Sequence, residues 1–307
     1  FRVDRQAAEA DIHIGNAAET GETFYGKKDV AVRFEIPQDQ ESGIRAAKYF
    51  AAASEEAVYA GFYAGEELWQ DCIDGMELML SEEGSYVIYV MTEDQVGNRA
   101  FAKSNEIVVD ETDPILRIEG VEDRSANGGS IVLHVSCEDA HYRKGSLEIS
   151  LTGANGGKEP ERKEETENEQ GASVIFGDFP TGKTYDDLYT LKVSAEDLAG
   201  NKTEKEMTFS VNRYGSVYDL DENTKQELST FYHTGEFPVT FLETNLDYVK
   251  AASVWCRKDG ETYRMEQGVG YERTLQEEKN GWKQYRYTVS SENFREEGTY
   301  EVMLMST

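Results

Sequence analysis

A glycine- and lysine-containing motif, Gly177-Asp-Phe-Pro-Thr-Gly-Lys-Thr184, is the first segment whose residues could do chemistry. It fits the pattern G-x-x-x-x-G-K-[ST], in which backbone N–H groups at the start of a helix bind phosphate. Here the chain continues within a few residues into an alternating strand that begins at Tyr189. The negative charges of Asp178, Asp186 and Asp187 also surround the loop. We therefore interpret the segment as a loop between strands that binds no nucleotide.

His134, Cys137 and His141 have the residue types of a zinc site. On a strand, residues three apart point to opposite faces, so His134 and Cys137 cannot converge without a bulge. Cys137 continues the alternating apolar positions that begin at Ile131. We expect a thiol in the core and an imidazole at the surface, and no metal. The other cysteines, Cys72 and Cys256, are too distant in the sequence to complete a metal motif or to indicate a disulfide framework.

The sequence contains no recognisable catalytic set. A nucleophile elbow of the form Gly-x-Ser-x-Gly does not occur, and the 60 acidic residues are so numerous that a carboxylate pair carries no information. The histidines, which would supply a general base, are scattered along the chain: His13, His134, His141 and His233. We predict no catalytic residue, no cofactor and no enzymatic activity.

Three acidic residues, Asp110, Glu111 and Asp113, could bind calcium, because hard cations prefer oxygen ligands. A solvated, Asp-rich turn before Pro114 explains the same residues. The additional ligands that a neighbouring segment would have to supply cannot be identified from the sequence. We therefore predict that no metal is bound here.

Trp69, Trp255, Trp282 and the 18 tyrosines could form a platform on which sugar rings stack. Aromatic side chains on strands are more often part of the core. Trp255 follows the sequence Ala-Ala-Ser-Val and is expected inside, whereas Trp69 and Trp282 flank polar segments and are weak candidates for exposed rings. The ligand, if there is one, stays unknown.

The composition limits the partners. The chain has 307 residues and a formal net charge of −29, and 38% of it is apolar. Such acidity repels phosphate backbones and anionic lipids, so nucleic acid and membrane surfaces are not expected partners. No apolar run is long enough to cross a bilayer, so we predict no membrane insertion within this segment.

The chain repeats itself, which predicts its architecture. Residues 86–98, ending Asp-Gln-Val-Gly-Asn, return as residues 189–201, ending Asp-Leu-Ala-Gly-Asn, and the repeat starts again at residues 298–307. A second landmark, an apolar residue followed by x-Val-Asp or x-Val-Asn, recurs at residues 1–4, 107–110 and 209–212.

These landmarks predict three modules, over residues 5–111, 112–213 and 214–307. Residues 1–4 are then the last strand of a preceding module, and the third module lacks its final strand. We expect the chain to belong to a longer polypeptide, which could hold a signal, an anchor or a catalytic domain.

Within a module the apolar residues alternate, as in strands with one buried face. Ile131, Leu133 and Val135 show this pattern, and so do Tyr189 and Leu191. Short strands and about 100 residues per module predict all-β, antiparallel sandwiches in an extended arrangement. The repeat also predicts strands for residues 44–69, with room for a short helical insertion, although their alanines favour a helix. Residues 153–171 are expected to be an exposed hairpin tip or a disordered loop.

The repeating unit combines Gly-x-Tyr, alternating apolar positions, Asp-x-x-Gly-Asn and a strand that ends in Val-Asp before Thr-Asp-Pro114. It resembles bacterial immunoglobulin-like repeats, which are tandem modules of large cell-surface and secreted proteins. The resemblance implies spacers, adhesins or accessory modules beside enzyme domains. The chain departs from immunoglobulin domains in having no cysteine pair between the sheets and no tryptophan on the second strand of the first two modules.

The shared residues have structural explanations. Asp94 and Asp197 can accept hydrogen bonds from backbone N–H groups two residues on, and the glycines of these turns supply positive φ. Tyr86, Tyr189 and Tyr300 look like the tyrosine corner of immunoglobulin-type sandwiches, with a buried ring and a hydroxyl bonded to upstream backbone.

Our leading hypothesis is a non-catalytic, monomeric segment of a bacterial surface or secreted protein, located outside the cell and acting as stalk, spacer or adhesive surface. Its partners would be host or cell-surface proteins or glycans. The alternative is a set of accessory modules, glycan-binding or spacing, of an extracellular carbohydrate-active enzyme.

Overall fold

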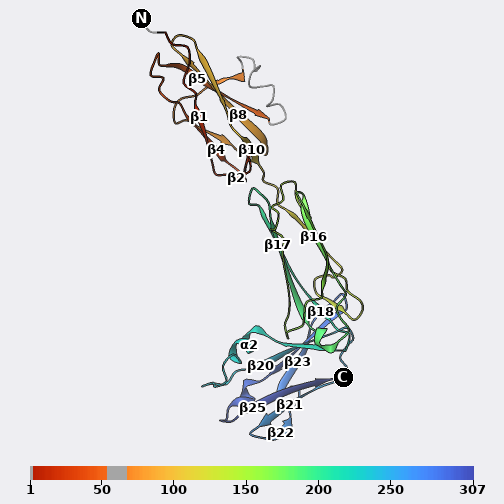
Figure 1. Cartoon of the computed structure of the whole chain (residues 1–307). Helices are drawn as coiled ribbons and strands as arrows, with labels where there is room; N and C mark the ends of the chain where they lie inside the picture. The colour runs from red at the N-terminus through yellow and green to blue at the C-terminus, as the bar shows by residue number, and fades with distance from the viewer. Residues whose placement is uncertain (1–2, 54–67) are drawn as a thin grey trace. The chain divides into compact units, whose positions relative to one another are not determined.

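The chain is described here from a computed structural model, which places residues 3–53 and 68–307 (Figure 1). Strands dominate the secondary structure. The contacts divide the chain into two compact units. The first comprises Phe1–Ile115, Glu138–Ser146 and Ala195–Thr203, and the second comprises Leu116–Cys137, Leu147–Ser194 and Glu204–Thr307. No helix of the described residues is long and apolar enough to cross a membrane.

The N-terminal segment forms two sheets, of order β1-β4-β7 and β2-β3-β10-β8-β5-β6, with β9 also pairing with β8. Alternate residues of β4, Val30, Val32 and Phe34, are fully buried, and Ile88 and Val90 of β8 pack in the same core. The strands are β1 (Asp11–Gly15), β2 (Ala18–Thr20), β3 (Thr23–Gly26), β4 (Val30–Glu35), β5 (Ile44–Ala53), β6 (Gln70–Asp71), β7 (Glu77–Leu80), β8 (Gly84–Asp94), β9 (Arg99–Lys103) and β10 (Glu106–Val109).

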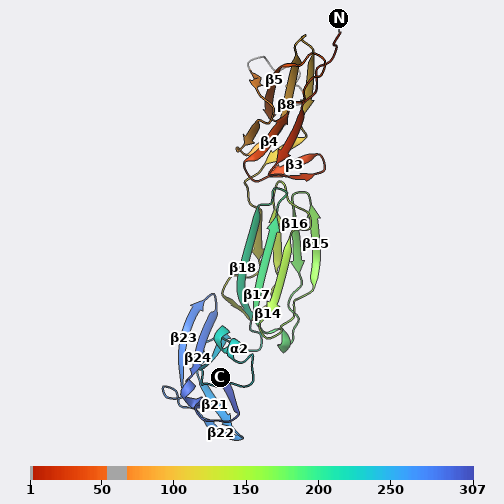
Figure 2. The same ribbon diagram turned by 90° about the vertical axis from the view of Figure 1, so that its left-hand side faces the viewer.

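The middle segment has two four-stranded sheets, of order β11-β13-β16-β15 and β12-β18-β17-β14 (Figure 2). Leu133, Val135 and Cys137 alternate with more exposed neighbours, as the sequence predicts. The strands are β11 (Ile115–Glu119), β12 (Ser125–Asn127), β13 (His134–Glu138), β14 (Glu148–Gly153), β15 (Arg162–Asn168), β16 (Gly171–Phe176), β17 (Leu188–Glu196) and β18 (Lys202–Val211), with a 3-10 turn, η3, at Lys183–Tyr185.

The C-terminal segment has a sheet of order β19-β20-β24-β23 and a smaller one of order β22-β21-β25. Val254, Tyr287 and Val289 are fully buried between them. The elements are β19 (Val217–Leu220), α2 (Glu222–Glu227), β20 (Val239–Asn245), β21 (Ala252–Lys258), β22 (Glu261–Arg264), β23 (Tyr271–Lys279), β24 (Trp282–Val289), η4 (Ser291–Phe294) and β25 (Tyr300–Ser306).

The architecture is a series of all-β sandwiches, as the alternating sequence predicts. Two strand pairs are parallel, β10 with β3 and β18 with β12, while the other pairs whose register is resolved are antiparallel. Ile44–Ala53 is a strand, as the repeat predicts against its alanine content, and residues 54–67 lie outside the described residues. The Glu-rich run forms β15, an entirely exposed strand that pairs with β16, so it is a hairpin. The module boundaries and the extended arrangement stay predictions.

The expectation for the tryptophans is corrected by the structure. Trp282, a candidate for exposure, is only 1% exposed, whereas Trp255, expected inside, is partly exposed. Trp282 begins β24 and packs against a small apolar cluster of the second unit, formed by Ala126, Leu188, Val217 and Leu246. The polar residues next to it in the sequence misled the prediction, because burial here is created by contacts with distant residues.

Candidate functional site

The Asp-x-x-Gly-Asn turns place a buried carboxylate at the end of β8. Asp94 is fully buried, and its Oδ1 accepts hydrogen bonds from Val96 N at 2.9 Å and Asn98 N at 2.8 Å. The Asn98 side chain donates to Asp94 Oδ2 at 2.6 Å. Gly97 has a φ of 91°, the left-handed conformation that the sequence predicts for the reversal.

The turn after β17 is built in the same way. Asp197 is fully buried and accepts hydrogen bonds from Asn201 N at 2.8 Å and Asn201 Nδ2 at 2.7 Å. Gly200 has a φ of 87°. Asn201 Nδ2 also donates to the carbonyl of Asp110 at 2.8 Å, so this turn holds the backbone at the end of the preceding closing strand.

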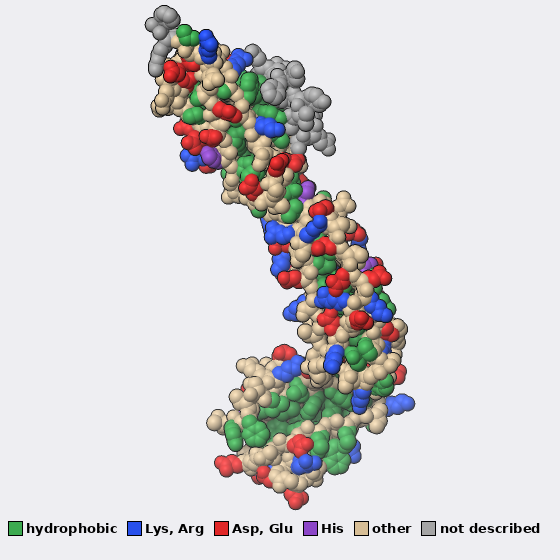
Figure 3. Space-filling model, viewed as in Figure 1, with side chains coloured by type: hydrophobic (Ala, Val, Ile, Leu, Met, Phe, Trp, Pro, Cys, Tyr) green, Lys and Arg blue, Asp and Glu red, His purple; other side chains and the backbone are tan. Residues whose placement is uncertain are grey.

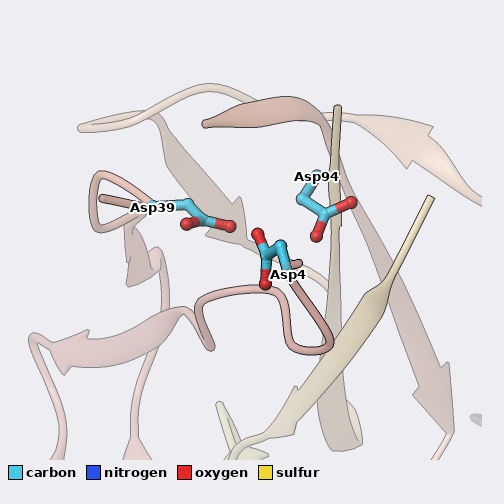
Figure 4. A group of neighbouring side chains, drawn as sticks. All are labelled: Asp4, Asp39 and Asp94. Atoms are coloured by element: carbon cyan, nitrogen blue, oxygen red, sulfur yellow. The ribbon is translucent and has the colours of Figure 1, made fainter. Parts of the chain in front are cut away.

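Each turn belongs to a cluster of three aspartates. The first contains Asp4, Asp39 and Asp94, each with one carboxylate oxygen within 4.8 Å of the others (Figure 4). Asp4 Oδ1 accepts from Gln6 N and Asp39 Oδ1 from Glu41 N. The Oδ2 atoms of Asp4 and Asp39 are buried and have no hydrogen-bond partner among the described residues. We call this group the first aspartate cluster.

The second aspartate cluster contains Asp110, Asp139 and Asp197 and lies within the first compact unit. Asp110 accepts from Thr112 N at 2.9 Å and from His141 Nδ1 at 2.7 Å. The backbone N–H of His141 donates to Asp139 Oδ1 at 2.7 Å. His141 therefore links two of the three carboxylates, Asp110 and Asp139.

The surroundings shift the pKa values of aspartates in the two clusters in opposite directions. Burial raises the pKa of Asp197 above its ordinary value, the charge of Asp110 raises it further, and the hydrogen bonds from Asn201 offset only part of this effect. Burial also raises the pKa of Asp139, against its hydrogen bond from His141, and the charges of Asp197 and Asp110 add to the increase. Burial raises the pKa of Asp94 as well, but its hydrogen bonds from Asn98, Val96 and Gly97 outweigh burial, so the net shift is downward.

Three converging carboxylates can bind a hard divalent cation or share a proton. The structure brings Asp110 to this arrangement but not Glu111 or Asp113, and Glu111 instead lies 3.8 Å from Lys28. Sequence reasoning missed the partners Asp139 and Asp197. The period of the repeat could have identified these partners, because the three aspartates of the first cluster precede those of the second by 106, 100 and 103 residues. The expectation of no metal stays a prediction, although its original reason, the missing ligands, no longer applies.

The segment that fits the phosphate-binding pattern is a closed loop. Lys183 begins a three-residue 3-10 turn and not an α-helix. Asp178 accepts from Ile131 N and from Arg213, and Asp187 accepts from Asn155 and Gly157 N. These hydrogen bonds fix the loop to neighbouring segments, and its lysine does not stand at the helix start that phosphate binding requires.

The residues of the suspected zinc site separate as predicted. Cys137 is buried in the core, and His134 Nε2 lies 2.9 Å from Ser173 Oγ on the more exposed face. His141 hydrogen bonds to Asp110 and Asp139 of the second aspartate cluster. Of the remaining histidines, His13 lies 3.0 Å from Glu35 and His233 lies 2.9 Å from the carbonyl of Thr230. The other ring nitrogen of His134, Nδ1, lies 3.2 Å from Glu119 Oε2, so this imidazole stands between a hydroxyl and a carboxylate, the pair of contacts that a histidine makes in an acyl-transfer triad.

One aromatic group stays available for a ligand. Trp69 is partly exposed, and its ring lies 6.1 Å from that of Phe50 and 6.3 Å from that of Phe101. Since Trp282 is buried, it does not contribute to such a surface.

The tyrosine hydroxyls bond as the resemblance predicts. Tyr86, Tyr189 and Tyr300 each donate to the carbonyl four residues upstream, at 2.8, 2.9 and 2.7 Å. Only the ring of Tyr189 is fully buried. The same hydrogen bond thus occurs in all three repeats.

Comparisons with known proteins agree with this geometry. The profile of the family described as Bacterial Ig-like domain (group 3) matches residues 76–214. The resemblance to bacterial immunoglobulin-like domains is confirmed. No curated protein matches the chain.

Several solved structures are similar at low identity. Dimeric latent PorU from Porphyromonas gingivalis is 12% identical with a TM-score of 0.22, over 95% of this chain and 30% of that one. Protocadherin gammaB7 EC3-6 is 12% identical with a TM-score of 0.29, over 91% and 68%. A tetra-tandem repeat from the extending region of a large adhesion protein is 12% identical with a TM-score of 0.29, over 98% and 74%. These low scores carry no argument about function, and the chain spans less than a third of PorU.

Proposed function

We propose that this chain is a non-catalytic segment of a bacterial cell-surface or secreted protein, in which three immunoglobulin-like modules act as stalk, spacer or adhesive surface. The observation that carries the proposal is the tyrosine hydrogen bond that recurs in all three repeats. Residues shared by the repeats thus bond to their own backbone, which supports a role in folding and not in reaction.

The placement of the chemically capable side chains supports the same proposal. Lys183, the lysine of the segment that fits the phosphate-binding pattern, lies in a loop that is fixed by hydrogen bonds to carboxylates. Cys137 is buried in the core. The carboxylates of Asp94 and Asp197 in the two aspartate clusters are held by the hydrogen bonds of their turns. We infer that the segment is monomeric and located outside the cell, and that it binds a host or cell-surface protein or glycan if it binds anything. Nucleic acid and cofactors are not expected.

Location is the direct test of this proposal. Antibodies raised against the segment should label intact cells of the bacterium that encodes it, or detect it in the culture medium. Labelling of a known cytoplasmic protein in the same cells measures lysis. Detection of the segment only after lysis would contradict the proposal.

The accessory-module alternative is favoured by one observation, the partly exposed aromatic group of Trp69, Phe50 and Phe101. A glycan array tests it. Reproducible binding that is lost in Trp69→Ala and kept in Trp255→Ala would favour a glycan-binding module. Equal signals from both variants, or no binding, would favour the stalk.

A further inference from the structure

The hairpin of β23 and β24 ends in a tight two-residue turn. Lys279 pairs with Trp282, so Asn280 and Gly281 form the turn, and their φ angles are 48° and 77°. Asn-Gly with positive φ at both positions is a preferred connection of this length, because its twist matches that of the strands. We call residues 279–282 the hairpin tip. The tip is therefore a stiff end of the C-terminal sheet, suited to pack against another element.

The hairpin tip is hydrogen-bonded to the middle segment. Gly281 forms an isolated β-bridge with Ser125, and Ala126 N donates to the carbonyl of Asn280 at 3.3 Å. Asn280 Nδ2 also donates to Glu122 Oε2 at 2.7 Å. Both sides of these contacts belong to the second compact unit. The tip and residues 122–126 are thus held together by direct bonds as well as by the chain that links the two segments.

A cation of the middle segment takes part in the same contact. Arg124 Nη1 donates to Glu277 Oε2 at 2.9 Å, and its guanidinium lies 5.9 Å from the centre of the Trp282 ring. Figure 3 shows Lys and Arg side chains among the acidic ones on the visible face of the middle segment. Although the chain has a net charge of −29, Arg124 therefore supplies a positive charge where the two segments meet.

The ring of Trp282 is the largest group in this contact. It begins β24 and is almost completely buried. Of the residues packed around it, Ala126 and Leu188 come from the middle segment, and Val217 and Leu246 come from the C-terminal segment. A buried tryptophan removes a large apolar area from water, and the hydrophobic effect is roughly proportional to that area. Separating the two segments would expose this ring.

Two further strands of the C-terminal segment contact the middle segment. Asn155 Nδ2 donates to the carbonyl of Tyr218 in β19 at 2.7 Å. Asn212 Nδ2 donates to the carbonyl of Thr244 in β20 at 2.9 Å. The contact therefore involves β19 and β20 as well as the hairpin tip, so one flexible side chain does not carry it alone.

The buried ring is not part of the common repeat. In the middle segment the corresponding hairpin joins β15 to β16, and Asn168 pairs with Gly171. Gly171 thus stands where Trp282 stands in the C-terminal segment, and Glu169 and Gln170 form the turn. The folding of a sandwich therefore does not require an aromatic ring at this place.

We propose that the hairpin tip fastens the middle and C-terminal sandwiches into one body that moves as a unit. The Trp282 ring and the bonds to residues 122–126 have to separate together before one sandwich can move against the other. A spacer with such a joint sets a direction as well as a distance across these two sandwiches. The proposal goes beyond the proposed function, because the fastening is the same in a stalk and in an accessory module.

Residual dipolar couplings of the full chain test whether the two sandwiches move together. One alignment tensor should fit the amides of both sandwiches in the unsubstituted chain. Trp282→Ala removes the ring from the joint and should require two tensors. Trp255→Ala removes a partly exposed ring of the same segment and should still give one. Two tensors in the unsubstituted chain, or one tensor in Trp282→Ala, would overturn the proposal.

Hydrogen exchange gives a second readout that leaves the buried ring in place. Asn280→Asp puts a carboxylate against Glu122, so the amide of Ala126, which bonds to the tip, should exchange about threefold faster or more. The double variant Asn280→Asp/Glu122→Gln should restore slow exchange, because it removes the repulsion. The amide of Phe176, which bonds to the carbonyl of Leu133 within the middle sandwich, is the internal control and should not change. Unchanged exchange at Ala126 in Asn280→Asp, or no recovery in the double variant, would contradict the proposal.

Discussion

At the scale of single residues, corresponding aspartates carry opposite pKa shifts. The pKa of Asp94 is lowered and that of Asp197 is raised. Both side chains are nevertheless fully buried, and both accept hydrogen bonds from an asparagine four residues further along the chain. The nearby charge of Asp110 adds to the increase in the pKa of Asp197, whereas at Asp94 the hydrogen bonds from Asn98, Val96 and Gly97 outweigh the effect of burial. The motif could be predicted from the sequence, but its electrostatics could not, because the neighbouring carboxylates come from distant strands and loops.

The raised pKa values of Asp139 and Asp197 predict a pH dependence. The folded state holds these protons more tightly than the unfolded chain, so their stabilising effect is complete below the ordinary value of 3.8 and is lost as pH rises through the raised values. Asp139→Asn keeps the oxygen that accepts from His141 N and removes one charge. We expect it to stabilise the chain at pH 7 by roughly 0.2–1 kcal/mol, the range for partly exposed charges, and to have less effect near pH 4.

Scanning calorimetry at pH 7 and near pH 4 measures this effect, as the shift of the unfolding transition that Asp139→Asn causes. Asp247→Asn, an exposed position outside both clusters, controls for the change in net charge. A stabilisation that does not depend on pH, or one that the control reproduces, would contradict the assignment.

Calcium titration tests the expectation that no metal is bound. The buried carboxylates already accept several N–H groups, and Asp110 also accepts from His141. We therefore expect isothermal calorimetry to detect no stoichiometric micromolar site. A stoichiometric site that is lost in Asp39→Asn would reject this prediction. The substitution is chosen because, in the first aspartate cluster, the Oδ2 atoms of Asp4 and Asp39 are buried and have no hydrogen-bond partner in the described part of the chain. Asp247→Asn is again the control.

At the scale of elements, most strands could be predicted because their alternation records which face is buried. Ile44–Ala53 required the repeat as well, since its alanines favour a helix. The helix α2 was not predicted. It has six residues, and it depends on Asp221 capping Thr224 N and on Thr224 Oγ1 accepting from Thr240 N, a contact with a distant strand. Local propensity contains no such information.

The tyrosine hydrogen bond should stabilise the second repeat most. Tyr189→Phe removes a buried hydroxyl and leaves the carbonyl of Tyr185 without this donor. We expect Tyr189→Phe to lower the free energy of unfolding by about 1–3 kcal/mol, because the hydroxyl is buried. Tyr300→Phe should lower it by about 0.5–1.5 kcal/mol, because Tyr300 is partly exposed. Hydrogen exchange of β17 and β25 measures both. Similar losses at the two positions would show that burial does not set the size of the effect.

At the scale of the whole molecule, the repeats predict an extended chain of modules with separate cores. The buried clusters around Val32 and around Tyr287 are each formed within one segment of the chain. A compact globule of 307 residues has a radius of gyration of about 19 Å. We expect small-angle scattering to give a clearly larger value and a distance distribution with a long tail. The net charge of −29 should favour separation of the modules, so the radius should change little or decrease slightly at high salt. A radius near that of the globule at low salt would reject the extended arrangement, and with it the proposed role as a stalk or spacer.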